Sequence, residues 1–424
     1  MEDGTTLLFD LPGFRVVECY EDGDGQRQVV VMGLAAEHAC PGCGVLVAKP
    51  YDHREMVVKD LPIGQRPLHL RWRKRRYACS EGACPRRTFT ETSTEVPPRH
   101  RLTGRLRAKL ESAASGSARS ISDVAGEYGV SWWSVQRALV VTAAGLRPDP
   151  TPVRVLGLDE TRARSVRWLF GAAGWRRSEP WMTSFVDLDL GRPGGLLGLT
   201  PGRSGAAVEG WLSQQSAEWR AGIEVVALDP SAPFASAIRR ALPRATIVVD
   251  HWHLVRLANQ MVTEVRQRVA REQLGRRGRK ADPAWAHRRL LLRAGDQLGS
   301  AGLRRLAGVL ATDDPSNEIG AAWGVKELLR GLLAARTRHD AAGRLYRFYD
   351  ACLAANMAET TRLAETIATW WPHIEPFLRT GITNARTEGY NRVIKQVKRV
   401  GCGYRNQANY ERRIVLHIAA RRAA

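Results

Sequence analysis

The chain has 424 residues and an apolar fraction of 44%, which excludes wholesale disorder and indicates roughly three domains. Its 64 basic and 43 acidic residues leave a formal charge of +21, and such an excess favours a polyanionic partner, most often nucleic acid. The longest apolar run, residues 139–146, is too short to cross a membrane, and the acidic start MEDGTTLLFD lacks the pattern of a signal peptide. We therefore predict a soluble cytoplasmic protein that does not bind membranes.

Four cysteines form two closely spaced pairs in the first hundred residues. Cys40 and Cys43 enclose a proline and a glycine, and Cys79 and Cys84 follow after 35 intervening residues. Two such pairs supply the tetrahedral set of thiolates that structural zinc prefers. We therefore predict that these four cysteines bind Zn²⁺; the alternative is two pairs of reduced, buried thiols. The other cysteines, Cys19, Cys352 and Cys402, are predicted to be small core residues.

The stretch RPLHLRWRKRRYACS (66–80) lies between the two pairs and has the period of a β-strand. Apolar Leu68, Leu70 and Trp72 alternate with basic residues. The basic side consists of His69, Arg71, Arg73 and Arg75. We predict that Arg71, Arg73 and Arg75 contact the DNA phosphate backbone at the edge of a zinc ribbon; the alternative is a basic strand that faces water.

Residues 120–140, SISDVAGEYGVSWWSVQRALV, have the pattern of a helix-turn-helix. Ala125 is small enough for a close helix contact, Gly129 suits the turn, and Val135 is apolar after it. Ser131 can cap the second helix.

The start of that second helix is a candidate DNA-reading surface. We predict that Trp133, Gln136 and Arg137 contact bases and phosphates, the alternative being an ordinary helical hairpin. The following segment, GLRPDPTP (145–152), has three prolines in eight residues and is predicted to be a linker.

Three later apolar runs end in aspartate. VRVLGLDE ends with Asp159, GIEVVALDP with Asp229 and ATIVVDHWHLVRLAN with Asp250, and helical segments follow the last two. WLFGAAGW and WMTSFVDLDLG are predicted as further strands of a meander. The pattern indicates a parallel or mixed sheet covered on both faces, with polar residues gathered at the carboxyl ends of its strands. For Asp229, which precedes Pro230, a helix cap is the alternative role.

The stretch ARTEGYNRVIKQVKR (385–399) is predicted to be a helix with one carboxylate among cations. At about 100° per residue, Glu388, Asn391 and Lys395 share a face, opposite an apolar face that packs inward. Together with Asp159 and Asp229, Glu388 supplies three hard oxygen ligands, which can hold two Mg²⁺ ions. We predict that Glu388 is a metal ligand; the alternative is a solvated helix face with paired charges. The cations predicted to attract the DNA backbone are Arg392, Lys395 and Arg399.

These features resemble the bacterial insertion-sequence transposases of the ISL-three family over nearly the whole chain. The most specific blocks are ALDPSAPFASAIRRALPRATIVVDHWHLVRLAN and NARTEGYNRVIKQVKRVGCGYRN. The resemblance implies an RNase H-like core in which Asp159, Asp229 and Glu388 form a DDE-type acidic triad with two Mg²⁺ ions, or Mn²⁺ in their place.

Two further sites rest on the same resemblance. Asp250 and His253 match an Asp-x-x-His signature, which makes His253 a candidate contact for the scissile phosphate or a flipped base. For Asp250 the alternative is a purely structural aspartate at a helix start, bonded to a nearby histidine. Arg203 and Ser204 match an arginine–serine pair of the family, and the resemblance implies that they contact DNA.

The predicted fold is therefore a multidomain α/β protein. It comprises a zinc-ribbon DNA-binding domain (1–100), a helix-turn-helix domain (101–147), an RNase H-like catalytic domain (148–261 and 376–404) with a mixed sheet and helices on both faces, an all-α insertion (262–375) and a basic C-terminal tail (405–424). The 159 positions from Asp229 to Glu388 require such an insertion. Within it, GRRGRKADP is predicted to be an exposed loop, and the tryptophans of AAWGVKELL and ATWWPHIEPF to be core rather than DNA-stacking platforms.

The predicted function is DNA transposition. The first two domains would bind terminal inverted repeats in double-stranded DNA, and the core would hydrolyse a phosphodiester and join the freed 3′-hydroxyl to target DNA. Because two element ends must be paired, we expect a homodimer or a larger assembly, associated with the bacterial nucleoid. The alternatives are a non-catalytic DNA-binding protein, such as a repressor or domesticated transposase, and an RNase H-like nuclease.

Overall fold

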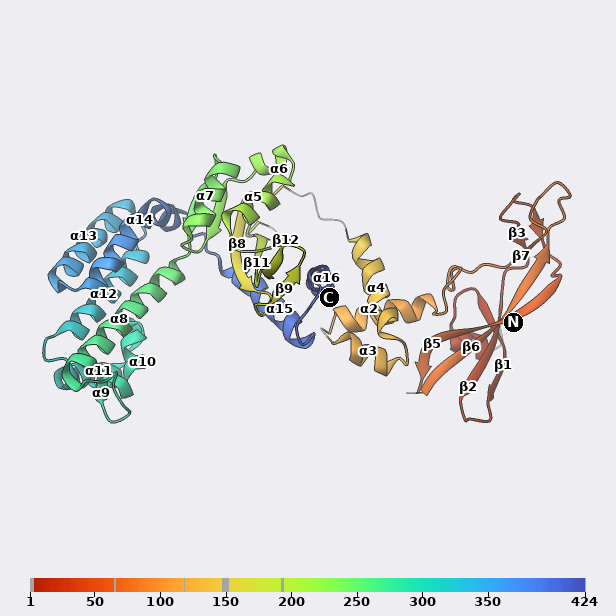
Figure 1. Ribbon diagram of the computed structural model, residues 1–424, viewed down its shortest axis with the longest axis horizontal. Helices are drawn as coiled ribbons and strands as arrows, with labels where there is room; N and C mark the ends of the chain where they lie inside the picture. Colours follow the sequence, from red (N-terminus) through yellow and green to blue (C-terminus); the bar gives the residue numbers. More distant parts are fainter. Residues whose placement is uncertain (1–3, 65, 118, 147–151, 192–193, 424) are drawn as a thin grey trace. The chain divides into compact units, whose positions relative to one another are not determined.

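The computed structural model describes residues 4–64, 66–117, 119–146, 152–191 and 194–423 (Figure 1). They form two compact units, one of residues 1–147 with 396–424 and one of residues 148–395. Residues 147–151 of the predicted linker lie outside the described residues. Among the described helices, none combines the length and hydropathy needed to cross a bilayer.

The first unit begins with helix α1 (Gly4–Phe9) and a twisted sheet. The strands are β1 (Phe14–Glu21), β2 (Arg27–Gly33), β5 (Asp52–Ile63) and β6 (Arg66–Ala78), in the order β1-β2-β6-β5, and β7 (Thr88–Thr90) pairs with β6. The predicted alternation of β6 is confirmed, because Leu68, Leu70 and Trp72 are buried while His69 and Arg71 are only half-buried. A short hairpin, β3 (His38–Ala39) with β4 (Leu46–Val47), carries the first cysteine pair.

The helices of this unit confirm the predicted helix-turn-helix. Helices α2 (Gly104–Ser115), α3 (Ile121–Glu127) and α4 (Trp132–Gly145) share one core. Gly129 provides the turn with φ of 59°, a conformation that glycine adopts without strain. The Ser131 hydroxyl accepts a hydrogen bond from the Ser134 amide at 3.2 Å and caps α4 as expected.

The C-terminal segment is not a free tail. Helix α16 (Gln407–Ala423) packs against α2 and α4, and Leu416 belongs to their core. The basic residues of 405–424 predict a tail, but the apolar residues interspersed among them in the sequence, Tyr410, Ile414 and Leu416, are buried. The prediction for the lone cysteines also needs correction, because only Cys352 is buried, whereas Cys19 and Cys402 are exposed.

The second unit contains a mixed five-stranded sheet. Its strands are β8 (Val155–Arg162), β11 (Trp181–Asp187), β12 (Gly195–Pro201), β13 (Val225–Leu228) and β14 (Thr246–Val249), in the order β12-β11-β8-β13-β14. The first three strands are antiparallel, and β8, β13 and β14 run parallel. This is the RNase H-like sheet that the sequence predicts.

Helices cover both faces of this sheet. Helices α5 (Gly205–Ser213) and α7 (Ala232–Ala241) pack on one face through Val208, Phe234 and Ile238. Helix α15 (Ala385–Val400) covers the other face, where Tyr390 contacts the cluster around Val186 and Ala227. A short helix, α6 (Ala217–Ala221), precedes β13.

The predicted insertion is all-helical. Helix α8 (His251–Leu274) starts at the sheet and leads into α9 (Pro283–Ala286), α10 (Arg288–Leu292), the 3₁₀ turn η1 (Gly295–Gln297), α11 (Ser300–Asp313), α12 (Glu318–Leu333), α13 (Arg338–Ala355) and α14 (Ala358–Thr380). Figure 1 shows α12, α13 and α14 side by side. The GRRGRKADP segment connects α8 to α9 as a loop, and Trp323, Trp370 and Trp371 pack against the core.

One predicted strand of the sheet folds differently. WLFGAAGW does not join the five-stranded sheet but forms a separate ribbon of β9 (Trp168–Gly171) and β10 (Gly174–Arg177). Both strands are exposed over most of their length. The apolar residues that predicted a sheet strand therefore lie at the surface of the ribbon and are not buried.

Candidate catalytic centre and DNA-binding surfaces

Asp159, Asp229 and Asp250 lie side by side at the carboxyl ends of neighbouring parallel strands. Ala227 pairs with Gly157, so two residues further Asp229 falls beside Asp159. Pairing of β13 with β14 extends to the ends of both strands, and the Asp250 amide donates to the Leu228 carbonyl at 3.1 Å. The sheet register therefore brings three carboxylates to one edge.

Helix α15 holds the Asp159 carboxylate in place. The Asn391 amide donates to Asp159 Oδ2 at 2.6 Å, and the Glu160 backbone amide donates to Oδ1 at 2.7 Å. The Ser184 hydroxyl donates to Asn391 Oδ1 at 3.0 Å and fixes the orientation of that amide. Burial and the neighbouring charge of Asp229 raise the pKa of Asp159 to about 7.

The start of α15 packs against the backbone of β8. The Asn384 side chain donates to the Leu158 carbonyl at 2.8 Å, and a Cβ at Gly157 would collide with Thr387 Oγ1, so glycine permits this close approach. Asn391 is 2% exposed. It faces the sheet rather than sharing an outer face with Lys395, which corrects the predicted orientation of the helix.

Glu388 lies on the margin of this packed face. It is half-buried, and Asn384 and Asn391 reach β8 from the adjacent turns of the helix. Among the described residues its carboxylate has no hydrogen-bond or ion-pair partner. The structure thus places Glu388 on the helix that binds Asp159, but outside the tightest cluster of acidic groups.

That tightest cluster consists of Asp229, Asp250 and His253, with one ligand atom from each lying within 4.8 Å of the others. His253 Nε2 is 2.8 Å from Asp229 Oδ2, and although burial opposes it, this contact raises the pKa of His253. Asp250 accepts from the Trp252 amide at 3.1 Å and caps α8, and its carboxylate also lies 3.3 Å from His251. Asp250 therefore caps a helix, as the structural alternative requires, and it also lies within the cluster of candidate metal ligands.

Two polar atoms of the cluster have no partner among the described residues. Asp229 Oδ1 and His253 Nδ1 are both buried, and neither atom forms a hydrogen bond with the described residues. A buried carboxylate oxygen without a partner is costly, and a bound cation would satisfy it. Oxygen ligands from adjacent carboxylates are also the donors that Mg²⁺ prefers.

Two basic residues lie close to this edge of the sheet. Glu160 is close enough to interact electrostatically with Asp229, and Arg203 and Arg256 offset part of that repulsion. Arg203 is exposed and stacks on the Trp181 ring at 4.3 Å. Ser204 caps α5 through its hydroxyl, so its side chain has a structural partner.

The first unit contains the four-cysteine site. Cys40 Sγ is 3.9 Å from Cys84 Sγ, and Cys43 Sγ is 3.5 Å from Cys79 Sγ. Tetrahedral zinc with Zn–S bonds of about 2.3 Å places its sulfurs about 3.8 Å apart, so the four thiols fit Zn²⁺. The Gly42 amide, which donates to Cys40, lowers the pKa of that thiol to about 7 and favours the thiolate.

The three arginines predicted on β6 have different environments. Arg75 is largely buried, pairs with the buried Glu91 at 2.8 Å and also donates to the carbonyls of Gly33 and Ala35. Arg71 is half-buried and pairs with Glu55 at 3.3 Å. Arg73 is half-buried without such a partner among the described residues. Arg75 therefore stabilises the fold, and Arg73 has the greatest freedom to reach a ligand.

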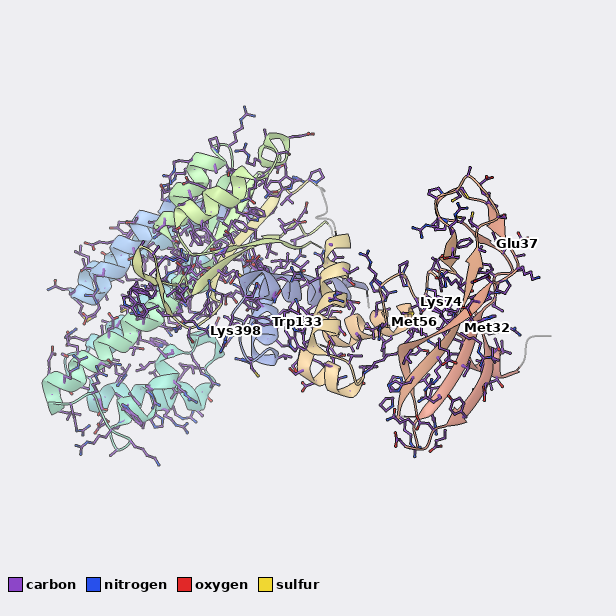
Figure 2. The ribbon with its side chains drawn as sticks, turned by 45° about the vertical axis from the view of Figure 1, so that its right-hand side comes forward. Met32, Glu37, Met56, Lys74, Trp133 and Lys398 are labelled. Carbon is purple, nitrogen blue, oxygen red and sulfur yellow. The ribbon has the colours of Figure 1, made fainter. Side chains whose placement is uncertain are left out.

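The residues predicted on α4 also divide. Trp133 is 70% exposed (Figure 2), and Arg137 is exposed. Gln136 is buried instead, because it follows Val135 on the inner side of the helix, and it donates to Asn409 of α16 at 3.0 Å. On α15, Arg392, Lys395 and Arg399 are exposed as predicted.

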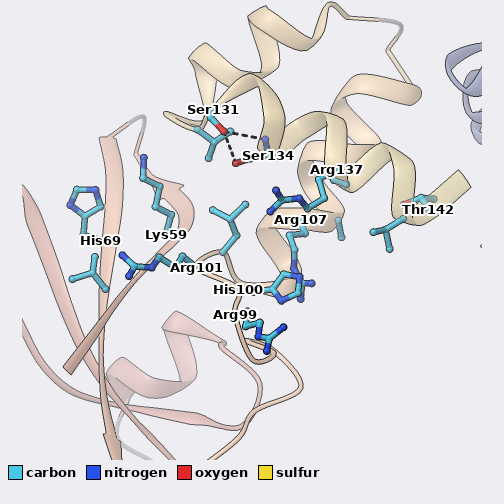
Figure 3. Close-up of a pocket in the computed structure, with 16 residues that line it drawn as sticks. Lys59, His69, Arg99, His100, Arg101, Arg107, Ser131, Ser134, Arg137 and Thr142 are labelled. Atoms are coloured by element: carbon cyan, nitrogen blue, oxygen red, sulfur yellow. Dashed lines mark hydrogen bonds between the residues drawn. The ribbon is translucent and has the colours of Figure 1, made fainter. Parts of the chain in front are cut away.

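A basic cleft of about 630 Å³ lies between the sheet and the helix-turn-helix (Figure 3). Its charged and polar lining includes Lys59, His69, Arg99, His100, Arg101, Arg107 and Arg137, and none of its lining residues in the described chain is acidic. The walls are tied together by the Lys59 amide, which donates to the Arg101 carbonyl at 2.9 Å, and by Thr103, which donates to buried Asp60 at 2.6 Å. The cleft is thus a firm cationic surface beside α4.

Replacing Arg137 by alanine is expected to weaken DNA binding about five- to tenfold and to reduce the salt dependence of binding by about one ion, because one predicted phosphate contact would be lost. Fluorescence anisotropy across a salt series measures both quantities. The matched control is Arg15→Ala, which removes the same charge from exposed β1 at the other edge of the sheet. Equal losses in both variants would mean that net charge alone drives binding.

The four-thiol knuckle, the helix-turn-helix and the RNase H-like sheet with acidic strand ends define a DNA-cleaving enzyme of the transposase class. A family model described as a transposase matches residues 173–414. A zinc-finger model of the transposases IS204/IS1001/IS1096/IS1165 matches residues 36–84, and a helix-turn-helix model of transposase family ISL3 matches residues 91–140.

The chain belongs to the ISL3 family of transposases. It is 24% identical over 398 residues to the transposase for insertion sequence element IS1001 of Bordetella parapertussis. The aligned region covers 93% of this chain and 92% of that protein. The predicted family, fold and transposase function are therefore confirmed. All four cysteines of the knuckle fall within the matched zinc-finger segment, which supports structural zinc.

Proposed function

We propose that Asp159, Asp229 and Glu388 form the catalytic triad and hold two Mg²⁺ ions, or Mn²⁺ in their place. The observation that carries this proposal is the convergence of Asp159 and Asp229 at one sheet edge, where burial and the charge of Asp229 raise the pKa of Asp159 to about 7 and Asp229 Oδ1 is buried without a partner among the described residues. Bound divalent ions would activate water or a 3′-hydroxyl and stabilise the leaving oxygen of a phosphodiester.

The other residues of the centre position these acids. Asn391 orients Asp159, and Ser184 in turn orients Asn391. Asn384 anchors to β8 the helix turn that carries Glu388. His253, held by Asp229 through Nε2, would orient that carboxylate beside the scissile phosphate.

The first unit would recognise the terminal inverted repeats of the element. Arg137 and Trp133 would contact DNA from α4, and the basic cleft beside them would bind the phosphate backbone. Arg203 and the exposed cations of α15 would contact DNA near the catalytic centre. Because both ends must be cut together, a homodimer or larger assembly would be the active form, acting on the element ends and on target DNA in the nucleoid.

The test is cleavage of DNA that contains the sequences flanking the reading frame. We expect nicks with free 3′-hydroxyls at the element ends in Mg²⁺ or Mn²⁺, at least about a hundredfold faster than without added divalent ions. Denaturing gels of end-labelled DNA locate the nicks. Repeat-specific binding without cleavage in either metal would instead indicate the non-catalytic DNA-binding protein, and cleavage only of RNA or junctions would indicate a nuclease.

A further inference from the structure

The ribbon of β9 and β10 exposes three aromatic rings. Trp168 is 60% exposed, Phe170 is 72% exposed and Trp175 is 68% exposed. Burying rings of this size contributes several kcal/mol of stability, so their exposure in one short ribbon points to a binding surface.

The register of the ribbon places the rings on one face. Phe170 pairs with Trp175, and Trp168 pairs with Arg177. Directly paired residues of antiparallel strands share a face, so these four side chains form one surface, which we call the aromatic face. The Phe170 and Trp175 rings are 5.2 Å apart at 61°. Leu169 and its partner Arg176 lie on the reverse face.

The segment around the ribbon is strongly basic. Residues 161–178, TRARSVRWLFGAAGWRRS, contain five arginines and no acidic residue. Arg167, Arg176 and Arg177 are exposed on or directly beside the strands. Aromatic rings interleaved with arginines suit a polyanion that also offers flat π surfaces, which is the chemistry of a nucleic acid strand with unpaired bases.

The base of the ribbon is fixed to the catalytic sheet. The Ser178 amide donates to the Arg167 carbonyl at 2.6 Å, and the Ala163 amide donates to the Pro180 carbonyl at 2.9 Å. The ribbon also follows directly from the carboxyl end of β8, the strand that carries Asp159. It therefore leaves the sheet from the edge where the acidic residues gather.

We propose that the aromatic face binds unpaired bases of a DNA strand beside the catalytic centre, with Arg177 and its neighbours contacting the phosphates. Bases stack on aromatic rings with little regard to sequence, so the surface would hold a strand that has been opened at the element end. This inference rests on the proposed function for its setting. A second copy of this chain is the less suitable occupant, because its charge of +21 would bring like charge to the same arginines.

The experiment compares the two faces of the ribbon in the full-length protein, without added divalent ions. The probe is a fluorescein-labelled oligothymidylate of about 20 nucleotides, with the matched duplex as reference. We expect Trp175→Ala to weaken binding of the single strand about tenfold and to change duplex binding less than about twofold. The matched control is Leu169→Ala, which removes a 49% exposed apolar side chain from the reverse face and should leave both affinities unchanged.

Three results would overturn the proposal: unchanged single-strand affinity in Trp175→Ala, equal losses in Trp175→Ala and Leu169→Ala, or loss of self-association in analytical ultracentrifugation with unchanged affinity. The last result would assign the aromatic face to a second copy of the chain. Because binding is measured without metal, failure of the proposed cleavage chemistry would leave this comparison intact. A Phe170→Ala variant repeats the test on the paired ring.

Discussion

Asp159→Asn and Asp229→Asn are each expected to slow strand cleavage by at least about a thousandfold. Asparagine keeps the size of the side chain but removes the charge that would bind a divalent ion, and loss of the activated nucleophile accounts for the scale of the effect. The measurement is the single-turnover rate of nicking at labelled element ends. Affinity for the same DNA should change less than about threefold, since the proposed repeat-binding surfaces belong to the other unit.

Asp189→Asn is the matched control for these variants. Its carboxylate lies in the same unit and accepts a hydrogen bond from the Gly191 amide, which an asparagine oxygen can also accept. Cleavage by this variant should equal that of the unmodified protein. If Asp159→Asn and Asp229→Asn cleaved within about tenfold of it, the proposed triad would be wrong.

The free energy of unfolding of the Asp159→Asn variant shows whether this variant remains folded. Burial raises the pKa of Asp159 to about 7, so the ionised side chain destabilises the metal-free fold. The penalty is absent below the ordinary pKa near 4, grows as the pH rises and is complete above 7. Asp159→Asn should therefore raise the free energy of unfolding by about 1–3 kcal/mol at pH 8 and change it little at pH 4.

The acidic residues at strand ends predict the acidic centre, but the sequence pattern does not predict the contacts that hold these residues in place. A strand that ends in aspartate is visible as an apolar run, and the register of parallel strands then forces Asp159 and Asp229 together. The polarity of Asn391 and its spacing from Lys395 predict an outer-face position. Only the close approach of α15 to Gly157 makes an amide on the inner face favourable, and that approach depends on tertiary packing.

The basic residues show a similar limit. Arg75 and Gln136 follow the pattern of DNA-contacting residues, yet Arg75 pairs with Glu91 and Gln136 bonds to Asn409. Glu91 is close in sequence to Arg75, but Asn409 is 273 positions from Gln136. A contact so distant in the chain leaves no local periodicity, whereas the helix-turn-helix itself was predictable from Gly129 and Ser131.

Cys84→Ser is expected to reduce bound zinc from about one ion per chain to almost none. The hairpin and loop around the metal site have a very small core of their own, made of Tyr77, Phe89 and two of the ligands, Cys40 and Cys84. Metal binding supplies about 10–16 kcal/mol in zinc-finger peptides, far more than so few apolar contacts can provide. The knuckle should therefore lose its structure with its zinc.

The unfolding should remain local, because the adjoining sheet has a separate core that includes Phe14, Leu70 and Trp72. Hydrogen exchange should show loss of protection in residues 38–47 and 79–90, with β1, β2 and α4 still protected. The control is Cys402→Ser, which removes an exposed thiol outside the knuckle and should keep both zinc and protection. Full zinc content in Cys84→Ser, measured by mass spectrometry of the metal, would exclude Cys84 as a ligand, and unfolding of the whole sheet would mean that its core depends on the metal.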